Sequence, residues 1–223
     1  MSKEILTALL ESDIWQEHQP MMADFRQGVY HGLLQNAVRQ LKREALYDSP
    51  IHGEDHIERT MLMAALLAWR ETVSQENTQL LLLAASYHDV GRVDDSYDTE
   101  HGPRAITKLG ELAGLGGQEL LLLQCAVAAH SRPDSMMEAT LTGIAPKDMS
   151  RALALSRLLK DADGLDRVRI RDLNPNFLRH RSARALSGFS EYVFELYFQR
   201  KAAPAAYWCP KRQRIIMGEK GEI

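Results

Sequence analysis

Histidine and aspartate residues stand at the borders of apolar segments throughout the middle of the chain. The apolar run 80–85 leads directly into His88 and Asp89, and the apolar segment 118–130 ends on a histidine. The residues in such positions are His56, His88, Asp89, His101, His130 and Asp163. Neutral imidazoles and carboxylates held on several rigid elements are ligands for divalent metal ions. A set without thiolates suits Mn, Fe, Co, Ni, Zn or Mg, and argues against a structural zinc site of the cysteine type.

Each of these residues, taken alone, is more simply a helix cap or a satisfied polar group of the core. The prediction of a metal centre therefore depends on all six converging. The elements that must position them are helices, because apolar residues recur with a helical period almost throughout the chain. No convincing strand alternation, internal repeat or linker is present.

The longest helical pattern covers residues 20–47. Apolar residues recur there every four positions from Phe25 to Ala45, which predicts one amphipathic helix that ends before Pro50. Ser74 is expected to cap a later helix, and Pro103 is expected to open another. Further helices are expected over residues 54–69, 74–88, 103–113, 118–130, 147–166 and 182–200, with loops over 89–102 and 131–146.

The fold class predicted from this pattern is all-α, with residues 1–223 forming a single helical bundle. Its core covers about residues 50–170, and the helices at 20–47 and 182–200 pack on that core. The metal site is expected where the helix ends converge. The segment 207–217 is expected to form a short extended piece.

Composition narrows the class of protein further. A net charge of −3 over 223 residues provides no general attraction for nucleic acid or for an anionic membrane. Two cysteines do not make a disulfide framework, and Cys125 in an apolar run is most simply a core residue. The polar, acidic N-terminus does not resemble a signal peptide, and no run approaches the ~18 apolar residues of a membrane span. These features predict a cytoplasmic protein; they do not indicate its oligomeric state.

Three short segments, "GEDHIERT", "AASYHDVGR" and "LKDADGLD", resemble the HD-domain superfamily of metal-dependent phosphohydrolases. The resemblance covers residues 50–170, and the ordered signature of that family is a histidine, a His-Asp pair and a final aspartate. It implies that His56, His88, Asp89 and Asp163 bind metal. Asp163 is preferred to Asp161 because the last ligand of the family usually follows an alanine.

Two further histidines between the His-Asp pair and the final aspartate occur in some branches of this superfamily. There the aspartate of the pair bridges two metal ions. The resemblance then implies that Asp89 is the bridge, that His56, His88 and Asp163 bind one ion, and that His101 and His130 bind the other.

The function implied by this resemblance is hydrolysis of a phosphomonoester or phosphodiester of a nucleotide-like substrate, cyclic dinucleotides included. A metal-activated hydroxide would be the nucleophile. Two alternatives use the same fold: a di-iron oxygenase resembling myo-inositol oxygenase or its phosphonate-cleaving relatives, and a module that binds a nucleotide without catalysis. The intact ligand set argues against the last of these.

Cationic residues near the ligands are candidates to bind the phosphate. Arg92, Arg104 and Arg132 are expected to contact it, since guanidinium groups bind phosphate in a bidentate manner. Arg92 and Lys160 are also candidate catalytic residues beside Asp89. Some relatives place a glutamate near the position of Arg92, and Asp94 or Asp95 could replace it here.

The remaining polar residues have less specific interpretations. His52 lies four residues before His56, and is either a substrate-binding residue or simply exposed. Asp161 and Asp166 are expected to cap a helix or orient a histidine. The segment "DRVRIRD", with Arg179, Arg181 and Arg184, most simply forms a solvated basic face. The histidines expected on the surface or in structural roles are His18, His31 and His180.

Overall fold

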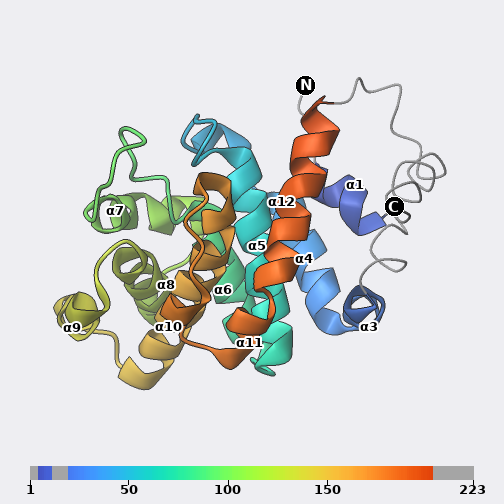
Figure 1. Ribbon diagram of the computed structural model, residues 1–223. Helices are drawn as coiled ribbons and strands as arrows, with labels where there is room; N and C mark the ends of the chain where they lie inside the picture. Colours follow the sequence, from blue (N-terminus) through green and yellow to red (C-terminus); the bar gives the residue numbers. More distant parts are fainter. Residues whose placement is uncertain (1–4, 12–19, 203–223) are drawn as a thin grey trace, which may run out of the picture.

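The computed structural model describes residues 5–11 and 20–202, and these residues form helices connected by short loops (Figure 1). No strand occurs within these two ranges. The predicted all-α fold class is therefore confirmed. His18, Cys209 and the segment 207–217 lie outside the described residues.

Helix α5 (Glu54–Arg70) runs through the centre of the molecule. Every residue from His56 to Ala68 is buried, so all sides of the helix are covered by neighbours. Gly53 precedes it in an extended conformation, and Glu54 and Asp55 in its first turn complement the helix dipole. A helix covered on every side is typical of the core of a bundle.

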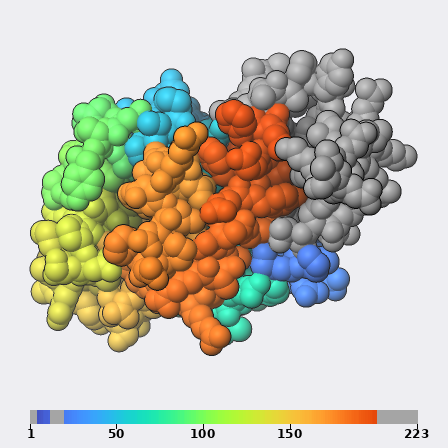
Figure 2. All heavy atoms as spheres, in the orientation of Figure 1, coloured from blue at the N-terminus to red at the C-terminus, as the bar shows by residue number. Residues whose placement is uncertain are grey.

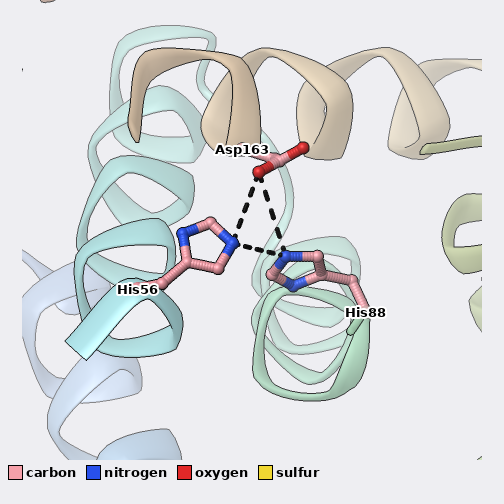
Figure 3. A group of neighbouring side chains, drawn as sticks. All are labelled: His56, His88 and Asp163. Atoms are coloured by element: carbon pink, nitrogen blue, oxygen red, sulfur yellow. Dashed lines mark hydrogen bonds and ion pairs between the residues drawn. The ribbon is translucent and has the colours of Figure 1, made fainter. Parts of the chain in front are cut away.

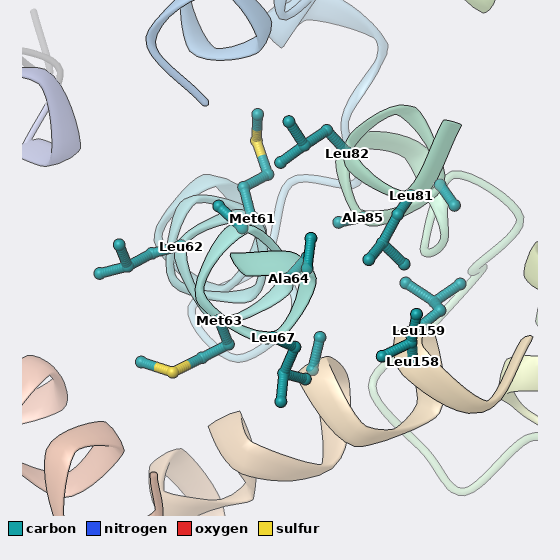
Figure 4. Close-up of a cluster of buried hydrophobic side chains, with 14 of the residues drawn as sticks. Met61, Leu62, Met63, Ala64, Leu67, Leu81, Leu82, Ala85, Leu158 and Leu159 are labelled. Carbon is teal, nitrogen blue, oxygen red and sulfur yellow. The ribbon is translucent and has the colours of Figure 1, made fainter. Parts of the chain in front are cut away.

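Helices α6 (Gln75–Tyr87) and α10 (Met149–Leu165) pack against α5. Their leucine and alanine side chains interdigitate with those of α5 in one hydrophobic core (Figure 4). Each fully buried leucine contributes roughly 1.5–3 kcal/mol to this packing. Ser74 caps α6 as predicted, since its hydroxyl accepts a hydrogen bond from the backbone N–H of Asn77.

On one side of this core lie α7 (His101–Ala113), α8 (Gly117–His130) and α9 (Met137–Ile144) (Figure 1). Helix α8 packs against both α7 and α10, so its buried face joins this side to the centre. Cys125 is fully buried within α8, which confirms its prediction as a core residue.

The other side carries α1 (Ile5–Glu11), α3 (Met21–Gln27) and α4 (Val29–Gln40). The short helix α11 (Arg181–Ala185) and the longer helix α12 (Ser187–Ala202) follow the segment 166–180, which includes the 3-10 turns η3 (Asp166–Ile170) and η4 (Pro175–Phe177). In the space-filling view these C-terminal residues lie across the front of the molecule (Figure 2).

The prediction of one helix over residues 20–47 was wrong. Gly28 has an extended conformation with φ −93° and ψ 163°, and it separates α3 from α4. Leu41 is extended as well, and the N–H of Lys42 donates a hydrogen bond to the hydroxyl of Tyr87 instead of continuing a helix. Only a 3-10 turn, η1 (Arg43–Ala45), follows. The buried face also shifts by one residue across the break, since Phe25 is buried in α3 but Leu34 and Val38 are the buried residues of α4, and Val29 is exposed.

The prediction of a loop over residues 131–146 was also wrong. This range contains the 3-10 turn η2 (Asp134–Met136) and the helix α9. The apolar face of α9 is short, with Met137 and Leu141 buried four residues apart. One pair of apolar residues four positions apart, so soon after Pro133, is too weak a periodic signal to predict a helix.

Two further helix boundaries differ from the prediction. The fourth expected helix begins at His101, two residues before Pro103, because a proline is tolerated throughout the first turn, where N–H groups lack partners inside the helix. The expected helix over 182–200 is interrupted at Leu186, which is buried and separates α11 from α12.

Candidate metal centre

The six predicted ligands come together at the ends of five helices. His56 lies in the first turn of α5, His101 begins α7 and His130 ends α8. His88 follows the last residue of α6, with Asp89 next to it, and Asp163 lies in the last turn of α10. Five of the six are buried, and Asp163 is the exception, with a side chain 25% exposed.

In each of the four histidines, a hydrogen bond at the Nδ1 atom fixes the orientation of the ring. The contacts are His56 to Asp166 Oδ2 at 2.7 Å, His88 to the carbonyl of Ala85 at 2.9 Å, His101 to that of Asp98 at 2.5 Å, and His130 to that of Val127 at 2.6 Å. Carbonyl and carboxylate oxygens accept hydrogen bonds, so Nδ1 carries the proton in each ring. Each Nε2 atom is thereby left with a lone pair, the arrangement found in metal-binding histidines.

The four Nε2 atoms face one another in two pairs. The Nε2 atoms of His56 and His88 lie 3.0 Å apart, and those of His101 and His130 lie 2.9 Å apart. Two facing lone pairs repel each other unless a cation binds both. Two nitrogens that bind one ion at right angles, each about 2.1 Å from it, lie about 3 Å apart. The donor set therefore fits a divalent ion at each pair.

Asp89 lies between the two histidine pairs. Its Oδ2 atom is 3.5 Å from Nε2 of His56 and 3.7 Å from that of His88. Its Oδ1 atom is 3.0 Å from Nε2 of His101 and 3.7 Å from that of His130. Both oxygens are buried without a hydrogen bond of good geometry within the described chain. These two oxygens, one facing each histidine pair, suit a carboxylate that joins two ions.

The protonation states also suit metal binding. Burial lowers the pKa of His88 to about 3, and it lowers that of His130 as well, so both rings are neutral at pH 7. Burial alone would raise the pKa of Asp89, but its interactions with the rings of His88, His101, His130 and His56 hold the pKa of this carboxyl well below its usual range. The neutral imidazoles of His88 and His130 and the ionised carboxylate of Asp89 are therefore available to a cation.

The last aspartate of the set is Asp163 (Figure 3). Its Oδ1 atom is 3.4 Å from Nε2 of His56 and 4.0 Å from that of His88, and the three side chains point toward one another. One nitrogen or oxygen from each lies within 4.8 Å of the others. Asp161 instead turns away, and its carboxylate accepts hydrogen bonds from the backbone N–H groups of Arg179 and His180.

Asp166 supports the centre from behind. Besides accepting the hydrogen bond of His56, its carboxylate accepts two from Arg59, at 2.6 and 3.0 Å. Arg59 is buried, and its guanidinium group lies over the rings of Phe194 and Tyr197 on α12, with centroid distances of 5.4 and 5.2 Å. The expectation that Asp166 orients a histidine agrees with this geometry; the contribution of Arg59 was missed.

Two arginines flank the centre. The Nε atom of Arg92 lies 3.0 Å from Oδ1 of Asp89. Nη1 of Arg169 lies 3.9 Å from Oδ1 of Asp163, and its side chain is only 8% exposed. The expectation of a solvated basic face was therefore wrong for Arg169, because the turn η3 folds this residue back against α10. No periodic signal marks this reversal in the sequence.

The other two arginines expected at the phosphate are engaged in ion pairs. Arg104 donates hydrogen bonds to the carbonyl of Gly91 and to Asp98, which connects α7 to the loop after Asp89. Arg132 forms a two-point ion pair with Glu100, at 2.6 and 3.2 Å. Both ion pairs hold the loop 89–100 in place. In this structure the two arginines therefore shape the site, and their guanidinium groups are paired with acidic residues.

His52 is buried next to the centre. Its ring packs edge-on against that of His56 at a centroid distance of 5.9 Å. Its Nδ1 atom lies 2.8 Å from Oδ1 of Asp95, which also accepts a hydrogen bond from Ser49. The interpretation of His52 as a simply exposed residue was therefore wrong, since this side chain links the first turn of α5 to the loop 89–100.

A cavity of about 250 Å³ opens beside the centre. Two of the candidate ligands, His130 and Asp163, line it, so a bound molecule can reach the metal positions from this side. Lys160 also lines the cavity, as do Arg167, Asp172, Asn174, Phe177 and Arg179. The side chain of Phe177 is 77% exposed. Except for Lys160, these residues come from the segment 167–179, for which the sequence contains no recognisable motif.

No helix within the described ranges has the length and apolar character needed to cross a membrane.

Comparison with protein-family models agrees with the geometry of the centre. The chain matched no curated protein and no solved structure. The family model of the HD domain matches residues 53–168, slightly more than half of the chain, and this range contains all six candidate ligands. The chain therefore belongs to the HD domain family, which consists largely of metal-dependent phosphohydrolases.

Proposed function

We propose that this protein is a metal-dependent phosphohydrolase that cleaves a phosphomonoester or phosphodiester of a nucleotide-like substrate in the cytoplasm. The position of Asp89 carries the proposal. One carboxylate oxygen faces His56 and His88, and the other faces His101 and His130. This arrangement supports two metal ions joined by one carboxylate, and a two-ion centre suits displacement at phosphorus.

The ions would be held by His56, His88 and Asp163 on one side and by His101 and His130 on the other. When bound, divalent ions lower the pKa of a coordinated water toward ~7 and offset negative charge on phosphoryl oxygens. Mn, Fe, Co, Ni, Zn and Mg all suit nitrogen and oxygen ligands. The hydrogen bonds at the four Nδ1 atoms keep the rings in place, so little reorganisation is needed during the reaction.

Arg92 and Arg169 extend positive charge to both ends of the centre. Arg92 contacts Asp89, and Arg169 approaches Asp163. The Nε atom of each is buried and lacks a hydrogen bond of good geometry within the described chain. Arg169 is therefore suited to donate from Nε to a phosphoryl oxygen as charge develops there, whereas Nε of Arg92 already lies 3.0 Å from Oδ1 of Asp89. Burial also keeps water from screening these charges.

The test of this proposal is a substrate panel without oxygen. The protein is purified anaerobically, its metals are quantified, and nucleoside monophosphates, linear phosphodiesters and cyclic dinucleotides are supplied with Mn²⁺. We expect release of phosphate or nucleotide. Turnover that requires Fe²⁺ and consumes oxygen would instead establish the oxygenase alternative. Binding of nucleotide without turnover under either condition would indicate a non-catalytic module.

Matched histidine variants control the experiment. His88→Ala removes an Nε2 donor of the centre and is expected to abolish turnover. His31 packs edge-on against Phe25, away from the centre, so His31→Ala is expected to retain turnover. Equal activity of the two variants would contradict the proposed role of the centre.

A further inference from the structure

The cavity beside the metal centre contains a pair of cations that converge on one oxygen atom. Nζ of Lys160 lies 3.0 Å from Oδ1 of Asp134, and Nη2 of Arg179 lies 2.5 Å from the same atom. Both cations line the cavity that His130 and Asp163 also line. A molecule in this cavity can therefore contact the metal positions and this cation pair together.

Lys160 has one replaceable partner. Its side chain is buried, and Nζ donates hydrogen bonds to the backbone carbonyls of Ala129 and Arg132. An ammonium group has three donors, and two are thus committed to backbone atoms that cannot leave. The third is directed to Asp134, whose side chain is 57% exposed on the short turn η2. Asp134 can rotate into solvent when another anion takes its place beside the two cations, whereas the carbonyls stay in place.

Arg179 is held by a partner that is separate from Asp134. Asp161 is fully buried, and its carboxylate accepts hydrogen bonds from the backbone N–H and from Nη1 of Arg179. His180 adds two further contacts to the same carboxylate, at 2.8 and 2.7 Å. The position of Arg179 is therefore set by Asp161. Its Nε atom is buried and has no hydrogen-bond partner within the described residues, so donor capacity remains.

We propose that Lys160 and Arg179 form a second anion-binding position, at which an acidic group of the substrate replaces the carboxylate of Asp134. The substrate would then be a small phosphoester with a second acidic group, its reacting phosphoryl group lying at the His130 and Asp163 end of the cavity. This inference rests on the proposed function and adds the class of substrate. The cavity volume of about 250 Å³ limits the enclosed part of the ligand to a small molecule.

A pair of inert phosphonates tests the proposal without turnover. Phosphonoacetate carries a second acidic group, and ethylphosphonate does not. Their dissociation constants are measured by calorimetry on the metal-loaded full chain without oxygen. We expect phosphonoacetate to bind at least about tenfold more tightly, as charge-assisted hydrogen bonds to a second group would produce.

Two variants identify the position that causes the preference. Lys160→Met is expected to abolish the preference for phosphonoacetate, and Asp134→Asn is expected to increase it severalfold by removing the competing carboxylate. Arg151→Met, which removes a charge at the other end of α10, is the control and is expected to keep the wild-type preference. Because Asp134 is exposed, the Asp134→Asn variant is expected to fold, and it tests the proposal even if Lys160→Met does not fold.

Equal affinity of the two phosphonates for the wild type, or an unchanged preference in both variants, would overturn the proposal. The proposed function is tested separately, because it would be contradicted by an absence of phosphoester turnover in the substrate panel and not by the binding of phosphonates. A preference that depends on Lys160 and Asp134 would stand even if that panel showed no hydrolysis.

Discussion

At the scale of single residues, each histidine of the centre depends on the hydrogen bond made by its other ring nitrogen. Three of the four acceptors are backbone carbonyls, at Ala85, Asp98 and Val127. Ala85 and Val127 lie in the last turns of α6 and α8, and Asp98 lies in the loop three residues before α7, so correct folding of this backbone orients the rings. Side-chain substitution cannot remove such acceptors, but a displaced backbone can.

Gly102 tests this dependence on the backbone. A Cβ atom at this position would lie 2.4 Å from the carbonyl oxygen of Val127 and 3.1 Å from Nδ1 of His130. Gly102→Ala should therefore displace the end of α8, with a loss of unfolding free energy of about 1–3 kcal/mol. Urea unfolding and metal content measure both effects.

Gly143→Ala is the matched control, since nothing lies within 4 Å of a Cβ atom at Gly143 in α9. This variant should gain roughly 0.5–1 kcal/mol from the higher helix propensity of alanine and keep its metal. If Gly102→Ala is as stable as Gly143→Ala and binds as much metal, the backbone around His130 tolerates displacement and this interpretation is wrong.

At the scale of elements, the C-terminal helix supports a metal ligand on the central helix. Phe194 and Tyr197 on α12 lie under the guanidinium group of Arg59, which holds Asp166, which in turn holds His56. Residues of α12 lie outside the range matched by the HD family model. This extension of the family fold thus contributes to the geometry of the centre.

Arg59→Met should reduce metal affinity by roughly 10–100-fold, because residues that orient metal ligands typically have effects of this size. Affinity is measured by titration with Co²⁺ against a chelator, and the visible spectrum of Co²⁺ reports the geometry of the site. Arg59→Lys should recover part of the affinity, since it retains one charged donor to Asp166.

The control for this substitution lies on the same helix. Arg70 packs over the ring of Trp69 at the exposed end of α5, so Arg70→Met removes an arginine stacked on an aromatic ring without reaching Asp166. Wild-type Co²⁺ affinity and spectrum are expected. Equal losses in both variants would show that general destabilisation, and not the orientation of His56, causes the effect.

Most long helices could be predicted because their apolar residues repeat over three or more turns. The helices now seen as α5, α6, α8 and α10 lie within two residues of their expected bounds. The breaks at Gly28 and Leu186 and the short helix α9 could not be predicted, because tertiary contacts decide them. Gly28 interrupts a period that itself continues, and α9 is too short to show one.

At the scale of the whole molecule, the candidate ligands could be predicted as a set but their supporting contacts could not. A recognisable family signature identifies His56, the His-Asp pair and Asp163 wherever they lie in the fold. The hydrogen bond between His56 and Asp166 spans 110 positions, so Asp166 could be expected to orient a histidine but no local pattern indicates which one. The same holds for the cavity walls, which the segment 167–179 forms by returning to the end of α10.

The ends of five helices, α5, α6, α7, α8 and α10, therefore build one centre. Its central property is that one carboxylate, that of Asp89, serves two histidine pairs. A variant without this carboxylate should lose both ions, whereas loss of one outer histidine should affect one ion. The number of ions per chain in these variants therefore distinguishes a joined centre, in which Asp89 binds both ions, from two independent metal sites.

The most direct test is the metal stoichiometry of four proteins, the wild type and three variants, loaded with Mn²⁺ and dialysed, measured by elemental mass spectrometry. We expect two ions per chain in the wild type, one in His101→Ala and none in Asp89→Ala. Asp94→Asn, on the exposed loop after the centre, should retain two. A wild type with a single ion, or an Asp89→Ala variant that retains two, would contradict the joined centre.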